Sequence, residues 1–167
     1  MSLTYLSHHG IKGQKWGIRR FQNSDGTLTP AGQKRYSKMS AIVTKRGEEV
    51  ILAEHKNKDK RNKDSDFTIY ANGKKVGNLF LEDHGSELYV NWIDIKKSER
   101  GKGYASSVMD YVVQYGKSKG YEYATLEVPG TSSDAHHIYK KVGFEDVEES
   151  NDKNDIWGGL TSMRRKL

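Results

Sequence analysis

Glycines and basic residues alternate in one short stretch, Arg100-Gly101-Lys102-Gly103-Tyr104-Ala105, which lies between an apolar run and an amphipathic run. This order predicts a strand, a loop and the first turn of a helix. Free backbone N–H groups and the positive end of a helix dipole would then meet at one point, which suits a phosphate or pyrophosphate. Because Gly101 and Gly103 lack a Cβ, a ligand could approach their backbone closely. Taken alone, the stretch could also be a solvated basic turn.

The residues on either side of this loop predict the elements that would hold it. Leu88 to Ile95 reads as a buried strand, and Ala105 to Lys119 as a helix that ends at Gly120. One face of this helix is apolar at Val108, Met109, Val112 and Val113. A second strand follows from Tyr123 to Val128, and a short helix then runs from Ser132 through Tyr139. The order strand, helix, strand predicts a crossover between two parallel strands.

Two motifs in this region resemble those of the GNAT superfamily of N-acetyltransferases. Arg100 to Ala105 fits the acetyl-CoA signature Q/R-x-x-G-x-G/A at every specified position. Ser132 to Phe144 fits the later pattern N-x-x-A-x-x-x-Y-x-x-x-G-F, except that Ser132 replaces the asparagine. The resemblance implies an α/β (α+β) fold, with a mixed, mostly antiparallel central sheet, flanking helices and a βαβ core that binds acetyl-CoA.

The resemblance also implies where acetyl-CoA, the acyl donor, would bind. The loop amides would hold its pyrophosphate, and the strand before the loop would bind its pantetheine arm through the backbone. The implied binding residues are Ile93, Asp94, Ile95, Arg100, Gly101, Lys102, Gly103, Tyr104, Ala105 and Ser132.

Two further residues are candidates for catalysis. Tyr139 falls on the tyrosine that commonly protonates the departing thiolate in this superfamily, although it could simply pack on the sheet. The attacking amine must be neutral, so a base should remove a proton. Glu127 resembles the glutamate of bacterial ribosomal-protein N-terminal alanine acetyltransferases and is our first candidate base, although it could be an exposed strand residue. Asp94 is a second candidate, and Tyr89 stands where histone-type members carry their glutamate.

The composition excludes several other kinds of chemistry. The 167 residues include no cysteine, which excludes disulfides, thiol nucleophiles and an acyl-cysteine intermediate. We also expect no metal site. No apolar run reaches about 18 residues, and the N-terminus has no apolar signal core. We therefore expect no membrane partner and no export.

The charge divides the chain into two parts. Residues 1–63 hold 14 lysines and arginines against 5 acidic residues, whereas residues 64–167 hold 14 against 17. We expect a basic, glycine-rich docking segment with a short helix over residues 1–39 and an acetyltransferase domain over residues 40–167. Residues 5–36 resemble a module of phage and prophage head-associated proteins, which implies a phage structural protein as partner and a location in the bacterial cytoplasm or on a virion. The segment carries no nucleic-acid-binding motif, so we expect no nucleic-acid partner.

The remaining residues predict hairpins and an unusual acceptor side. Asn72-Gly73 predicts a tight turn between strands at Phe67–Ala71 and Lys75–Leu81, and Arg46-Gly47 predicts a second hairpin upstream. Members of the superfamily usually place two helices between their first and second strands, and these help to form the acceptor site. Residues 56–66 are polar and show no helical period, so the acceptor, a protein or a small amine, stays open.

The last residues, Ile156 to Met163, predict a closing strand, and Arg164-Arg165-Lys166 a basic tail. Two functions fit the whole sequence. The first is a phage- or prophage-encoded N-acetyltransferase that transfers acetyl directly to an amine, and the second is a non-catalytic binding module of the same fold. The intact loop and Tyr139 favour the enzyme, whereas the missing helices favour the binding module.

Overall fold

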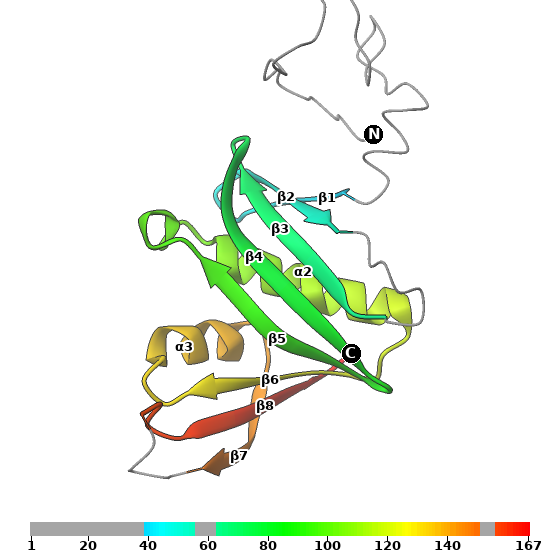
Figure 1. The fold of residues 1–167 in the computed structure, drawn as a ribbon, viewed down its shortest axis with the longest axis vertical. Coiled ribbons are helices and arrows are strands. Elements are labelled where there is room, and N and C mark those ends of the chain that lie inside the picture. The colour runs from blue at the N-terminus through cyan, green and yellow to red at the C-terminus, as the bar shows by residue number, and fades with distance from the viewer. Residues whose placement is uncertain (1–38, 56–62, 151–155) are drawn as a thin grey trace, which may run out of the picture. The chain divides into compact units, whose positions relative to one another are not determined.

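The structure, a computed structural model, describes residues 39–55, 63–150 and 156–167. These residues form an α+β fold (Figure 1). Its elements are β1 (Met39–Val43), β2 (Glu49–Glu54), β3 (Ser65–Ala71), β4 (Lys74–His84), β5 (Glu87–Ile95), the short 3-10 helix η1 (Lys97–Glu99), α2 (Tyr104–Lys119), β6 (Tyr123–Pro129), α3 (Ser133–Lys141), β7 (Glu145–Ser150) and β8 (Leu160–Lys166). The predicted docking segment lies outside the described residues except for Met39, which is the first residue of β1.

One sheet contains all the strands of the described residues, in the order β1-β2-β3-β4-β5-β6-β8-β7. From β2 onward, neighbouring strands are antiparallel except β5 and β6, which are parallel. A parallel pair needs a crossover, and α2 supplies it between β5 and β6. The predicted mixed, mostly antiparallel sheet with a βαβ unit is therefore confirmed.

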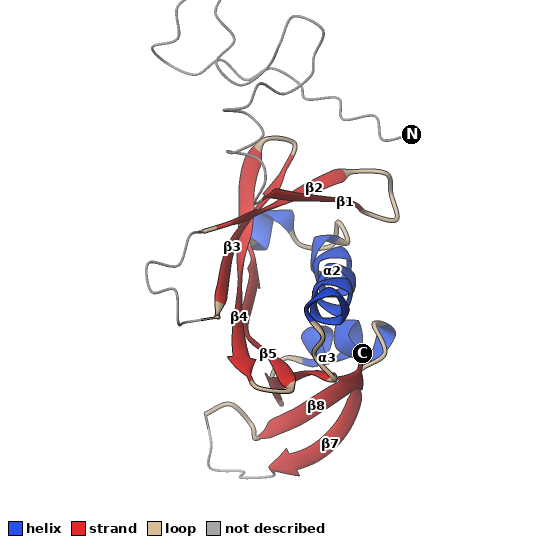
Figure 2. Cartoon of the chain, turned by 90° about the vertical axis from the view of Figure 1, so that its right-hand side faces the viewer, coloured by secondary structure: helices blue, strands red, loops and turns tan. Residues whose placement is uncertain are grey.

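The core lies between this sheet and α2. Val108, Met109, Val112 and Val113 are each no more than 1% exposed, as the apolar spacing of this helix predicted. They face sheet residues such as Leu79 and Leu88, which are also buried. Figure 2 shows that α2 and α3 both lie on the concave side of the sheet. None of the helices of the described residues covers the opposite side of β3, β4 and β5, which we call the open face.

A tight turn and a close approach between two strands fix β4 and β5 ahead of the glycine loop. Asn72 and Gly73 both have positive φ, 51° and 72°, as expected of the predicted two-residue hairpin turn. Further along β4, Gly77 pairs with Ile95, and a Cβ at Gly77 would collide with the backbone carbonyl of Asp94. Glycine at this position therefore lets β4 and β5 approach each other where β5 ends.

The prediction for the C-terminal residues was partly wrong. Residues 156–159 form a turn rather than a strand, with Gly158 and Gly159 at positive φ. The three basic residues after Met163 belong to β8 rather than to a tail, because each pairs with a residue of β6. The guanidinium of Arg164 lies 4.6 Å from the ring centre of Tyr123, and Arg165 donates a hydrogen bond to the carbonyl of Val142.

Candidate active site

The parallel strands β5 and β6 separate halfway along their length. They pair only from Glu87–Tyr123 to Val90–Leu126, although β5 continues to Ile95 and β6 to Pro129. On its other side, β5 stays paired with β4 up to Ile95. The backbone of Ile93, Asp94 and Ile95 thus borders a gap on the β6 side. A substrate arm with amide groups could bind there like an added strand.

The glycine loop follows directly after β5 and leads into α2. Gly103 is the residue that caps α2, with φ 87°, and no side chain caps the helix there. The first helical hydrogen bond joins the Ser107 N–H to the Gly103 carbonyl at 3.1 Å, so earlier N–H groups of the first turn have no acceptor within the helix. A Cβ placed at Gly103 would meet no protein atom within 4 Å. The loop therefore offers an accessible backbone surface that fits a pyrophosphate.

The two basic side chains of the loop make contacts with residues just before it in the chain. Arg100 Nε donates a 2.9 Å hydrogen bond to the Ile95 carbonyl, and its Nη2 lies 3.7 Å from Asp94 Oδ1. Lys102 Nζ lies 2.6 Å from Glu99 Oε2, and this hydrogen bond raises the pKa of Lys102 and lowers that of Glu99. The Asp94 carboxylate thus lies beside the Arg100 guanidinium in an exposed ion pair.

Tyr104 shows a contact that sequence reasoning missed. Its side chain is 2% exposed, and a hydrogen bond with the Glu48 carboxylate is the main cause that raises the pKa of Tyr104. Glu48 lies in the turn between β1 and β2, and its Oε2 is buried without a hydrogen-bond partner among the described residues. No motif links the two residues, because only the pairing of distant strands brings them together.

Tyr139 lies on α3, which packs against α2 and β6. Its half-buried ring contacts the core, with its centre 6.2 Å from that of Phe144. Burial raises the pKa of Tyr139 above its ordinary value of 10.0, so the phenol keeps its proton at neutral pH. Ser132 precedes α3, and its N–H donates a 2.8 Å hydrogen bond to the Pro129 carbonyl at the end of β6. The start of α3 is thus tied to the gap between the strands.

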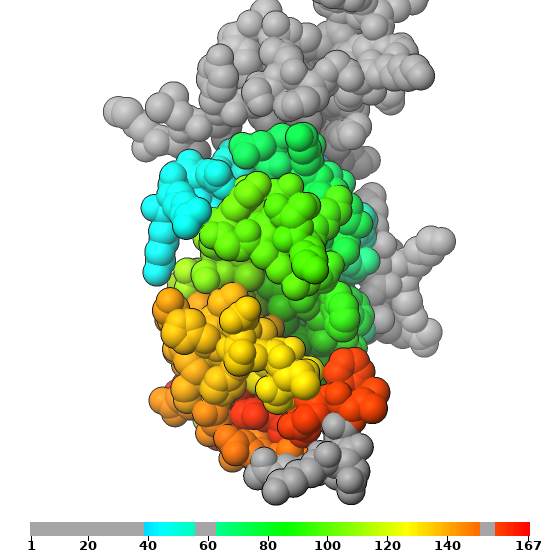
Figure 3. Space-filling view, turned by 90° about the vertical axis from the view of Figure 1, so that its left-hand side faces the viewer, coloured from blue at the N-terminus to red at the C-terminus, as the bar shows by residue number. Residues whose placement is uncertain are grey.

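Glu127 lies on β6 one residue after the last β5–β6 pair. Its neighbours Leu126 and Val128 are buried on the α2 side, so the exposed Glu127 side chain points to the open face. Its negative charge is, after burial, the second cause that raises the pKa of Tyr89 on the neighbouring strand. Figure 3 shows that the surface of β5, in bright green, adjoins that of α3 and β6, in gold and yellow.

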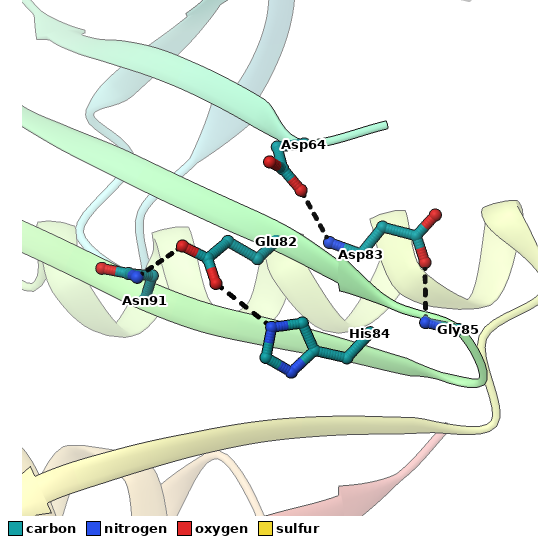
Figure 4. A network of polar contacts seen from close by, with 6 residues as sticks. All are labelled: Asp64, Glu82, Asp83, His84, Gly85 and Asn91. Atoms are coloured by element: carbon teal, nitrogen blue, oxygen red, sulfur yellow. Dashed lines mark hydrogen bonds and ion pairs between the residues drawn. The ribbon is translucent and has the colours of Figure 1, made fainter. Parts of the chain in front are cut away.

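The open face also carries residues that the sequence patterns did not single out. Trp92 is 60% exposed and lies opposite Phe80 of β4. Next to them, Glu82 accepts one hydrogen bond from the side-chain amide of Asn91, and its other carboxylate oxygen is hydrogen-bonded to the His84 ring (Figure 4). The register shift between Phe80 and Leu81 marks a β-bulge at Asn91, which a pattern of alternating residues cannot reveal.

The structure thus brings most of the predicted site residues to one place. The loop from Arg100 to Ala105, the residues Ile93 to Ile95, Glu127 and Ser132 surround the gap between β5 and β6, and Tyr139 lies on the helix beside it. Within residues 39–55, 63–150 and 156–167, no three metal-ligating side chains cluster. The helices in these same ranges are too short or too polar to cross a membrane.

Relatives in sequence match this region. Residues 36–144 match the acetyltransferase (GNAT) family. Over 103 residues, the chain is 29% identical to an uncharacterised N-acetyltransferase from Methanocaldococcus jannaschii. That match covers 53% of this chain and 42% of the relative, so the chain spans less than half of the relative's length.

Solved structures share the fold. A GNAT family acetyltransferase from Elizabethkingia anophelis with acetyl-CoA bound has a TM-score of 0.61 at 13% identity, over 71% of this chain and 98% of that one. The spermidine N-acetyltransferase of Vibrio cholerae in complex with CoA and spermine has a TM-score of 0.58 at 17% identity, over 64% and 68%.

The fold and the arrangement of the glycine loop beside the separated strands agree with this family match. The chain belongs to the acetyltransferase (GNAT) family. Acetyl-CoA fits its site as the co-substrate, because the uncapped helix end and the unpaired strand are arranged as such a molecule requires.

Proposed function

We propose that this chain transfers the acetyl group of acetyl-CoA directly to a primary amine, with Glu127 as base and Tyr139 as acid. The observation that carries the proposal is the separation of β5 from β6 directly beside the uncapped N-terminus of α2. The pyrophosphate would bind the amides from Gly101 to Ala105, where the helix dipole favours an anion. The pantetheine arm would follow the backbone of Ile93 to Ile95, with Ser132 at the far side of the gap.

The two catalytic roles follow from the surroundings of each side chain. The amine nitrogen attacks the thioester carbonyl carbon, the C–S bond breaks, and the electron pair leaves with sulfur. Glu127, exposed on the open face, accepts the proton that the amine loses. Tyr139, whose burial keeps its phenol protonated, donates a proton to the departing thiolate. The products are the acetylated amine and free coenzyme A.

We propose that the amine approaches from the open face, past Trp92. The exposed indole could hold an alkyl chain or a cationic group, and Glu82 and Glu127 add negative charge on this side. The acceptor could belong to a protein or to a small molecule; the Vibrio cholerae neighbour is named for spermidine. The alternative is a non-catalytic binding module, which the open face favours because the described residues place no helix over it.

Transfer with defined amines separates these possibilities. The full chain would be incubated with acetyl-CoA and either spermidine or a lysine-containing peptide, and the acetylated product measured by mass spectrometry. We expect product with the wild-type chain and much less with Tyr139→Phe. Tight binding of acetyl-CoA without any transfer to either amine or to proteins of a bacterial lysate would instead support the binding module.

We also propose that the chain is encoded by a phage or prophage, works in the bacterial cytoplasm and docks on a phage structural protein. The support is the sequence resemblance of residues 5–36, which lie outside the described residues. In the full chain, Trp16→Ala together with Phe21→Ala should abolish capture of a phage head protein and leave acetyl-CoA binding unchanged. Equal capture by both proteins would refute the docking role.

A further inference from the structure

Tyr89 lies where β5 and β6 are about to separate. It pairs with Thr125 of β6, so Glu127 follows two residues later on the same face of the sheet. This diagonal position on the neighbouring strand is within reach of an aromatic and a long side chain. Burial and then the negative charge of Glu127 are the main causes that raise the pKa of Tyr89, so its phenol stays protonated and can donate to this carboxylate.

A second contact holds the Tyr89 ring from the side of β4. The pairing of β4 with β5 places Glu82 opposite Tyr89 and His84 two residues further along the same face. The His84 ring stacks on Tyr89, with ring centres 4.9 Å apart and planes at 10°. His84 Nε2 lies 3.1 Å from Glu82 Oε2, which fixes the imidazole in this position (Figure 4).

The β-bulge completes this arrangement. Leu81 pairs with Val90 and Phe80 with Trp92, so Asn91 is the extra residue of β5. The bulge directs Asn91 to the open face, where its Nδ2 donates a 2.6 Å hydrogen bond to Glu82 Oε1. Both oxygens of Glu82 are therefore engaged, and contacts run from Asn91 through Glu82 and His84 to the ring of Tyr89, on the same face of the sheet as Glu127.

We propose that Tyr89 is a positioning residue for acetyl transfer: it holds the Glu127 carboxylate at the point where β5 and β6 separate. The contacts of Asn91, Glu82 and His84 keep its ring in place. This inference rests on the proposed role of Glu127 as base. An exposed glutamate without such a partner samples several rotamers, and a displacement of about 1 Å at a reacting group can cost roughly 100-fold in rate.

The test is a double-mutant cycle in the full chain with Tyr89→Phe and Glu127→Gln. Tyr89→Phe keeps the ring that stacks on His84 and removes only the hydroxyl. With spermidine or a lysine-containing peptide as acceptor, we expect Tyr89→Phe to lower kcat roughly 10- to 100-fold, with KM for acetyl-CoA unchanged. In the Glu127→Gln chain the same change should have no further effect. Tyr123→Phe, on the same face of β6, is the control and should keep wild-type kcat.

Urea unfolding of the same proteins measures the contact without any acceptor. We expect the two changes to be coupled by about 3- to 10-fold in the unfolding constant, as for one hydrogen bond. Additive effects on unfolding, or an equal loss of kcat from Tyr89→Phe in both backgrounds, would overturn the positioning role and leave Glu127 as base. Full kcat in Glu127→Gln alone would refute the proposed base and with it this inference.

Discussion

The two sides of the β5–β6 pair are built in different ways. On the donor side, α2 closes the core, and the loop before it is held by Arg100 on the Ile95 carbonyl and by Tyr104 on Glu48. On the open face, where we propose that the acceptor enters, the described residues place no helix over the sheet, and Trp92 stays 60% exposed. Binding of the acetyl donor would depend on backbone geometry, whereas binding of the acceptor would depend on side chains at the surface.

This difference explains why the fold points to the acetyl donor but does not identify the acceptor. A pyrophosphate needs free amides and a helix dipole, which a fixed backbone supplies whatever the neighbouring side chains are. An acceptor is selected by the shape and charge of the surface it meets, which changes with each substitution. We therefore assign the donor from the fold, and propose the acceptor only as a class.

The largest expected effect is on acetyl transfer itself, the step in which donor and acceptor react. Tyr139→Phe should lower kcat by about 10²- to 10⁴-fold, because the departing thiolate loses its proton donor. Steady-state kinetics with acetyl-CoA and spermidine measures this, and calorimetry should show unchanged acetyl-CoA binding. Equal turnover in both proteins would mean that solvent or another group protonates the thiolate.

A smaller effect, on the free energy of unfolding, is expected where β4 and β5 approach each other at Gly77. Gly77→Ala should destabilise the fold by roughly 1–3 kcal/mol, because the new Cβ meets the Asp94 carbonyl and backbone must move. Gly116→Ala is the matched control. Its Cβ meets the side chains of Leu167 and Leu88 rather than backbone, Leu167 can rotate, and alanine favours a helix. Equal unfolding free energies for the two variants in urea would contradict the role of the close approach.

A still smaller effect is expected beneath the loop. Tyr104→Phe should cost about 1 kcal/mol of unfolding free energy, because the half-buried Glu48 carboxylate loses its donor. Urea denaturation measures the loss, and Tyr123→Phe serves as the control. A fully stable Tyr104→Phe protein would show that this contact does not hold the first turn of α2.

The smallest expected effect is a pH dependence. The pKa of Tyr104 is raised above 10.0 in the folded chain, so the unfolded chain ionises first as the pH rises. Stability from this group is complete below pH 10.0 and falls as the pH rises through and above that value. Thermal melts from pH 8 to 11, on the order of the tyrosine pKa range, should show a smaller alkaline loss for Tyr104→Phe than for the wild-type chain.

The sequence predicted the elements around the glycine loop well because local signals specify them. Gly103 caps α2, Asn72-Gly73 forms the hairpin, and the apolar face of α2 is buried, as the spacing of each indicated. Contacts between distant segments could not be predicted in the same way. Glu48 reaches Tyr104, and Tyr89 reaches Glu127, only because the strand register brings them together. The basic residues of β8 misled the prediction because their charge resembles that of a tail.

The most direct test of the account is acetyl-CoA binding by the loop, measured by calorimetry for two glycine variants. Gly103 and Gly85 both have positive φ, 87° and 79°, and a Cβ at either meets no protein atom within 4 Å. Gly103→Glu and Gly85→Glu therefore introduce the same strain and charge, but only the first places them at the start of α2. We predict that Gly103→Glu abolishes binding while Gly85→Glu keeps wild-type affinity. Equal affinity in the two variants would contradict the assignment of the donor site.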